Sequence, residues 1–176
     1  MFREMRRKKQ QLSDNECVDL LKEKTSGVLS VMGDDGYPYG VPISYVYHEE
    51  RIYFHSALSG HKIDAISRYD KASFTVIGQD EIVSAQFTTY FRSVIAFGRV
   101  QILEGEAEKL KAVSMIADRY SPGADPESRQ KEIAHGFNHA HVLEFTIENM
   151  TGKEAIELRR RSTESGDAKL NAASMK

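Results

Sequence analysis

Short apolar segments separated by strong turn signals run along most of this chain, and they constrain its fold more than any other feature. The segments predicted as strands cover residues 27–32, 39–47, 51–55, 72–78, 93–103 and 141–147. Pro42 has no N–H to donate to a ladder, so the second strand has an open or bulged edge. Short strands at hairpin spacing with few helices are typical of a small antiparallel barrel. We therefore predict a mainly β fold, a barrel of six to seven strands with flanking helices.

Two of these segments carry apolar side chains on both faces. In residues 72–78, Phe74 and Val76 lie on the face opposite Ile77, and residues 93–103 show the same two-sided pattern. A lone barrel in water would keep one face of each strand polar. We therefore expect the outside of the barrel to be covered, most economically by a second copy of the chain.

Apolar residues at helical spacing predict helices over residues 14–24, 60–69 and 106–120, with a short helix over 128–136. At the start of the first helix, Ser13 and Glu16 have the spacing of a capping box, in which each side chain binds the other residue's backbone N–H. Cys17 follows on the apolar face of this helix. We interpret it as a packing residue rather than a reactive thiol.

Composition and charge limit the function classes. The 176 residues carry a net charge of −2, which argues against a protein that coats nucleic acid. No apolar run approaches the ~20 residues that cross a bilayer, and no apolar segment follows the basic N-terminus. We expect a cytoplasmic protein without nucleic-acid or membrane partners. Its parts are a basic tail (1–11), one domain (12–157) and a disordered tail (158–176).

The densest group of polar side chains lies where the strand ending at His55 leads into the helix that begins near Gly60. His61 and Lys62 occupy the first turn of that helix, where unpaired N–H groups carry partial positive charge. A lysine there is favourable when an anion lies between the ammonium and the helix. The segment predicts either a phosphate site for a small ligand or a helix capped by Ser59 with Lys62 in solvent.

Two further groups of polar residues are candidates for binding. The planar guanidinium of Arg92, at the entry to an apolar strand, suits a bidentate contact with an anion, although a surface arginine explains it equally well. If the strand predicted from 141 begins earlier, His139 and His141 would share a strand face, as some metal ligands do, with His135 nearby. No cysteine or acidic ligand accompanies them at a standard spacing. We therefore expect no metal and interpret them as solvated or capping histidines.

Five short segments stand in a characteristic order and spacing. They are GYPYGVP (36–42), IYFHSA (52–57), GHKID (60–64), SFTVIG (73–78) and YFRSV (90–94). Together they resemble the pyridoxamine-5′-phosphate-oxidase-like flavoproteins, and among these the nitroimidazole-resistance (Nim) branch. The resemblance runs from about Met5 to Lys153. It implies a split barrel that binds FMN as a homodimer, with the flavin at the subunit interface.

Ten positions of the chain match the flavin-binding segments of that family. They are His55, Ser56, Ala57, His61 and Lys62 for the phosphate and ribityl chain, Arg92 and Ser93 for a second phosphate-side segment, and Val41, Ile43 and Ser44 for the strand that lines the isoalloxazine. His55 also matches the histidine that the Nim branch places beside the flavin. The resemblance therefore makes His55 a candidate catalytic residue, with a purely packing role as the alternative.

The function that the resemblance implies is an FMN-dependent oxidoreductase. It would pass electrons from NAD(P)H or another reductant to a small acceptor such as a nitro compound or a quinone. The alternative is a non-catalytic carrier of flavin or, because of the histidines near 135–141, of haem. Ser56 stands where cysteine is frequent in the Nim branch, which removes thiol chemistry there. The chain has no tryptophan and no C-terminal substrate-gripping segment, which argues against vitamin B6 oxidation.

Overall fold

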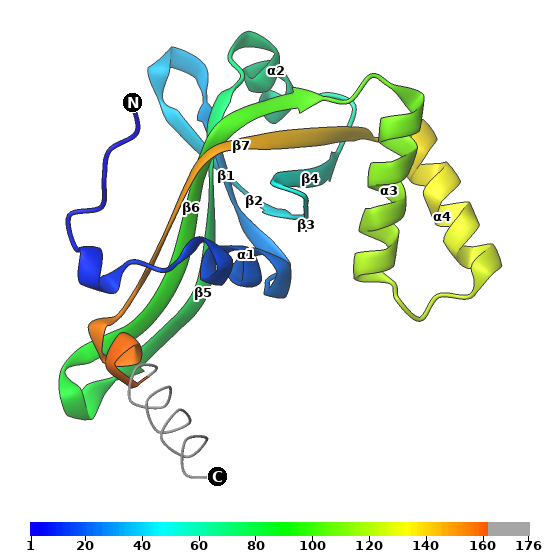
Figure 1. Cartoon of the computed structure of the whole chain (residues 1–176). Helices are drawn as coiled ribbons and strands as arrows, with labels where there is room; N and C mark the ends of the chain where they lie inside the picture. The colour runs from blue at the N-terminus through cyan, green and yellow to red at the C-terminus, as the bar shows by residue number, and fades with distance from the viewer. Residues whose placement is uncertain (162–176) are drawn as a thin grey trace.

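The computed structural model describes residues 1–161; residues 162–176, most of the predicted C-terminal tail, lie outside the described residues. Seven antiparallel strands form one strongly curled sheet in the order β2-β1-β5-β6-β7-β4-β3 (Figure 1). The strands are β1 (Ser26–Met32), β2 (Pro38–Ser44), β3 (Val46–His48), β4 (Arg51–Ser56), β5 (Lys71–Val83), β6 (Thr88–Ile102) and β7 (His141–Glu154). Among the described residues no ladder joins the edge strands β2 and β3, so the sheet is not closed. The predicted antiparallel split-barrel fold is confirmed.

Besides the helical residues 156–161, four α-helices and three 3-10 turns flank the sheet in the described residues. They are η1 (Lys8–Gln10), α1 (Asp14–Glu23), η2 (Asp34–Gly36), α2 (His61–Arg68), η3 (Ser84–Gln86), α3 (Glu106–Tyr120) and α4 (Pro126–His139). Helix α1 packs on β7, and the α3–α4 hairpin stands beside the part of the sheet that contains β3 and β4 (Figure 1). None of the helices in residues 1–161 combines the length and the apolar character needed to span a bilayer.

Local sequence signals place the starts of two helices. The capping box between Ser13 and Glu16 is present at the start of α1, as predicted. Cys17 is buried in this helix, and burial raises the pKa of its thiol to about 11, in agreement with a packing role. Helix α4 begins earlier than the predicted 128–136, because Asp125 accepts two backbone N–H groups as N-cap and Pro126 is suited to the first helical position.

The strand predicted over residues 39–47 is interrupted at Tyr45, which separates β2 from β3. Tyr45 is fully buried, and its hydroxyl donates to the carbonyl of Leu21 over 2.8 Å. Its backbone N–H donates to the carbonyl of Thr25 over 3.1 Å and also lies 2.8 Å from the hydroxyl of Tyr120. Partners from α1 and α3 therefore hold this residue in addition to its bond with the residue that precedes β1. Pro42 lies in the edge strand β2, as its missing N–H predicts.

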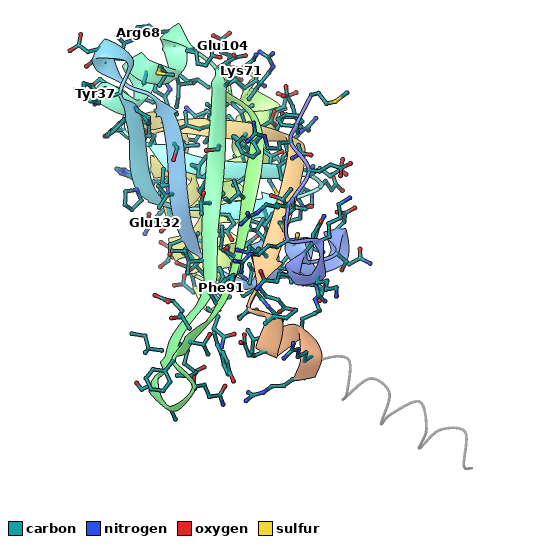
Figure 2. All side chains as sticks on the ribbon, turned by 90° about the vertical axis from the view of Figure 1, so that its left-hand side faces the viewer. Tyr37, Arg68, Lys71, Phe91, Glu104 and Glu132 are labelled. Atoms are coloured by element: carbon teal, nitrogen blue, oxygen red, sulfur yellow. The ribbon has the colours of Figure 1, made fainter. Side chains whose placement is uncertain are left out.

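Residues 80–89, which lie between the predicted strands 72–78 and 93–103, form the paired end of the long β5–β6 hairpin. Asp80 lies opposite Phe91, and the pairing continues to Val83 opposite Thr88. Figure 2 shows this hairpin extending beyond the rest of the sheet, with Phe91 near its base. Ladder hydrogen bonds use only the backbone, so polar side chains do not prevent pairing here. Phe87 ends the turn in a left-handed conformation and is 99% exposed.

Both ends of the described chain contact the domain. Gln11, in the predicted N-terminal tail, forms a bridge with Lys153, and Gln10 is buried. Residues 156–161 are helical. Arg159 in this helix donates to both carboxylate oxygens of Glu16, over 2.8 and 3.1 Å. The ordered domain therefore includes residues on both sides of the predicted boundaries at 12 and 157.

Candidate functional site

A cavity of about 630 Å³ lies between the α3–α4 hairpin and the sheet. On the sheet side it is lined by Ser44 at the end of β2, His55 in β4 and Val142 in β7. The alternation of β4 explains the position of His55, because Phe54 and Ser56 on either side of it are buried while His55 is exposed. Two residues predicted to lie beside the flavin, Ser44 and His55, therefore open into one cavity.

The two helices form chemically different walls of this cavity. Helix α3 contributes the apolar side chains of Val113, Ile116 and Ala117, which are buried or half-buried. Helix α4 contributes mostly polar residues, which are Ser128, Arg129, Glu132, His135 and His139, together with Gly136. A ligand in the cavity would contact the apolar side chains of α3 and the hydrogen-bonding groups of α4.

Helix α3 is fixed to the body of the protein at its C-terminal end. One nitrogen of the Arg119 guanidinium donates to the last carbonyls of α1, over 2.7 Å to Lys22 and 2.8 Å to Glu23. The hydroxyl of Tyr120 lies 2.6 Å from the carbonyl of Thr25. Carbonyls at a helix end have no partner within the helix, so Arg119 satisfies them from outside. Helix α4 packs chiefly on α3.

His135 and His139 form a stacked pair one turn apart on α4, with ring centroids 4.6 Å apart. Nδ1 of His139 lies 3.0 Å from the carbonyl oxygen of His135. A carbonyl oxygen only accepts, so this contact places a proton on Nδ1, and in the neutral imidazole Nε2 is then the acceptor. The expected sharing of a strand face by His139 and His141 is wrong, because His139 ends α4 and His141 begins β7. The described residues contain no group of side chains arranged to hold a metal.

The junction before α2 differs from the capped-helix interpretation. Gly60 is the N-cap, with φ of 123°, and no side chain caps the helix, so Ser59 does not play that part. Lys62 is half-buried, burial lowers its pKa, and its ammonium has no ion pair with residues 1–161. His61 stacks on Tyr39 with ring centroids 4.1 Å apart. Lys62 is thus a predicted phosphate-side cation that has no partner among residues 1–161.

Ser56 and Ala57 lie between the cavity and this junction. Ser56 is buried at the end of β4, opposite His141, and Ala57 is exposed directly after it. Val41 and Ile43 lie half-buried on the edge strand β2, where Ile43 packs against the main core. Val41 and Ile43 on β2 and the residues at the end of β4 therefore lie between the cavity and α2.

Arg92 and Ser93 lie in a different part of the sheet. Arg92 donates to one carboxylate oxygen of Glu154, over 3.0 Å from Nε and 2.5 Å from Nη2. Arg99, seven residues further along β6, pairs with Lys71 just after α2. Seven strand residues span about 23 Å, so Arg92 lies far along β6 from the residues that follow α2.

Sequence reasoning missed most of the cavity lining. The apolar wall of α3 has ordinary helical spacing, and nothing in its sequence indicates a cavity rather than a core contact. The histidines of α4 were visible, but their common direction depends on the continuation of α4 to His139, beyond the predicted end at 136. A longer predicted α4 would have placed His135 and His139 one turn apart on one face.

Comparisons with known proteins agree with this architecture. Residues 13–154 match the family model described as pyridoxamine 5′-phosphate oxidase. A candidate 5-nitroimidazole antibiotic resistance protein from Bacteroides thetaiotaomicron has a similar structure, with a TM-score of 0.69 and 21% identity over 82% of this chain and 86% of the other. An FAD-binding protein from Mesorhizobium loti gives 0.58 and 27% identity, over 83% and 97%. An FAD and heme binding protein from Mycobacterium smegmatis gives 0.66 and 21%, over 84% and 73%. A comparison with curated protein sequences finds no match.

Proposed function

The chain belongs to the pyridoxamine 5′-phosphate oxidase family, and from this premise we propose that it is a flavoprotein that binds FMN and reduces a small acceptor. Solved structures with this fold include proteins described as FAD-binding. The observation that carries the proposal is Lys62, a half-buried ammonium without a partner in the described chain, in the first turn of α2. An anionic phosphate would neutralise this ammonium and accept from the free N–H groups of the same turn.

The chain's own residues would hold the flavin from two directions. Lys62 with the end of β4 would bind the phosphate and ribityl chain, and Val41, Ile43 and Ser44 would lie beside the ring system. Arg92, predicted on the phosphate side, is already paired with the buried carboxylate of Glu154. A phosphate contact from Arg92 would therefore compete with that ion pair.

The flavin would supply the redox chemistry, taking electrons from NAD(P)H or another reductant and passing them to a nitro compound or a quinone. The imidazole of His55 opens into the cavity and makes no hydrogen bond with residues 1–161, so it is free to donate to the acceptor. A reaction of this kind suits a cytoplasmic protein with access to NAD(P)H.

We also propose a homodimer with the flavin at the subunit interface. The support is an apolar surface on β5 and β6 that the single chain leaves in contact with solvent. Ile77 is 64% exposed, and Ile95 and Phe97 are 38% and 40% exposed. Large exposed apolar side chains on neighbouring strands mark an interaction surface.

The proposal is tested by titrating the purified chain with FMN and following absorbance and fluorescence quenching. Lys62→Met should weaken FMN binding by about 10- to 100-fold, because a charge-assisted hydrogen bond contributes about 1.5–3 kcal/mol. Lys71→Met removes the same charge from an exposed site at the start of β5 and serves as the control. Absence of FMN binding by the wild-type chain would refute the proposal.

A second candidate is a carrier without turnover that holds flavin or haem. The observation in its favour is that His55, His135 and His139 all line the same cavity, and histidine is a common axial ligand of haem iron. An absorption spectrum distinguishes a haem carrier from a flavoprotein, because bound haem gives a Soret band. A chain that binds FMN but reduces neither nitro compounds nor quinones with NAD(P)H or dithionite would be a flavin carrier.

A further inference from the structure

We propose that the cavity between the α3–α4 hairpin and the sheet is the acceptor site, and that it selects neutral aromatic molecules with a nitro or quinone oxygen. This inference rests on the proposed function, since it names the substrate class of the same flavin site. The cavity of about 630 Å³ lies within the range of about 300–1,000 Å³ that is typical of sites for small organic ligands. Ser44 and His55 in its lining connect it to the expected flavin position.

The lining favours an aromatic ligand. Val113, Ile116 and Ala117 form a continuous apolar wall on α3. On the neighbouring helix α4, the stacked imidazoles of His135 and His139 offer flat rings. Apolar surface and aromatic rings in one lining favour a ring system over a flexible polar chain.

The charges of the lining favour a neutral ligand. The guanidinium of Arg129 is the cation of this wall, and its Nε donates to a carboxylate oxygen of Asp118 over 2.7 Å. Glu132 adds a carboxylate that has no ion pair within residues 1–161. An anionic ligand would meet this carboxylate without an unpaired guanidinium to offset it.

Hydrogen bonding explains why the ligand should carry an oxygen that accepts a hydrogen bond. The imidazole of His135 makes no hydrogen bond with the described part of the chain, so its ring N–H is free to donate. Nε2 of His139 is left as an acceptor by the contact of Nδ1 with the His135 carbonyl. A nitro or quinone oxygen, which accepts and does not donate, therefore pairs with His135 rather than with His139.

The test uses two probes of equal ring size, neutral 4-nitrobenzyl alcohol and anionic 4-nitrobenzoate. Binding is measured by equilibrium dialysis without reductant, with the FMN-loaded chain and with the flavin-free chain. We expect the neutral probe to bind at least tenfold more tightly than the anion. Ala117→Phe fills the cavity and should weaken the neutral probe at least tenfold while FMN affinity is unchanged. Ala107→Phe, the same change on the exposed part of α3, should have no effect.

A second variant covers the case in which Ala117→Phe does not fold. His135→Phe keeps an aromatic ring but removes its N–H, and we expect a 3- to 10-fold loss of affinity for the neutral probe, consistent with a hydrogen bond of about 1 kcal/mol. Equal binding of both probes, or no change in either cavity variant, would overturn the inference even if FMN binds normally. Failure of the wild-type chain to bind FMN would instead refute the proposed function, and the dialysis of the flavin-free chain would still report on the cavity.

Discussion

Replacing Arg92 by methionine tests whether this residue stabilises the fold or binds the flavin phosphate. Its guanidinium makes two hydrogen bonds with Glu154, whose side chain has no solvent exposure. The other oxygen of Glu154 lies 2.9 Å from Nε of Arg159. Removing Arg92 therefore leaves a fully buried carboxylate with one of its two cationic neighbours.

The expected cost follows from this geometry. Breaking a buried ion pair by removing one partner costs about 3–5 kcal/mol. The value for Arg92→Met should lie near the lower end, about 3 kcal/mol, because Arg159 remains and because water reaches the 34% exposed Arg92 side chain. With a urea m-value of about 2 kcal/mol/M, the unfolding midpoint should fall by about 1.5 M. Circular dichroism during urea unfolding measures this midpoint.

The double variant Arg92→Met with Glu154→Met provides the control. Replacing both partners by apolar side chains removes the uncompensated charge, so its stability should return to within about 1 kcal/mol of the wild type. A midpoint shift below about 0.5 M in the single variant, about a third of the expected shift, would refute the reasoning. A double variant that is less stable than the single variant would refute it as well. If the stable double variant lost FMN affinity, Arg92 would bind the phosphate as the family resemblance implies.

Three further predictions concern stability and use the same urea assay. Burial alone would raise the pKa of Glu16, but hydrogen bonds from Arg159 and the N-cap lower it to about 2. The ionised Glu16 therefore stabilises the fold fully above about pH 4.5, and this stabilisation is lost as the pH falls toward 2. Glu16→Gln should therefore lower stability at pH 7 and flatten the decline in acid, and an unchanged pH profile would contradict this. Tyr120→Phe removes the hydrogen bonds of its hydroxyl with the backbone of Thr25 and Tyr45, whose own hydrogen bond remains, and should cost about 1 kcal/mol, whereas an unchanged midpoint would contradict it. Gly98→Ala would place its Cβ 2.0 Å from a backbone oxygen and should destabilise strongly, whereas Gly123→Ala, with open space around it, should be nearly neutral; equal midpoints for the two would contradict the packing argument.

Signals carried by neighbouring residues predicted the elements of this fold well. The capping box at Ser13 and the amphipathic spacing of residues 106–120 involve residues within one or two turns, and the structure contains both features. The break at Tyr45 was not predictable in the same way, because its partners come from residues 21 and 120. The apolar alternation of residues 39–47 continues across the break and contains no sign of it.

The same distinction explains what sequence could say about the site. Lys62 was found because its position in a helical first turn is a local property, and the structure shows a half-buried ammonium there. The pairing of Arg92 with Glu154 joins residues 62 positions apart, so the arginine looked free for an anion. The cavity depends on the packing of two helices against a sheet, and its lining comes from three separate parts of the chain.

The anchoring of the two helices suggests how one fold could serve different acceptors. Helix α3 carries the apolar wall and is held to α1 and to the β2–β3 connection by Arg119 and Tyr120. Helix α4 carries the polar wall and packs chiefly on α3, so substitutions on its cavity face disturb few contacts with the sheet. Exchanging His135 or Glu132 would then change the hydrogen bonding and charge offered to a ligand at little cost to the barrel. In the proposed arrangement the sheet and α2 would hold the flavin, and α4 would select the acceptor that reaches it.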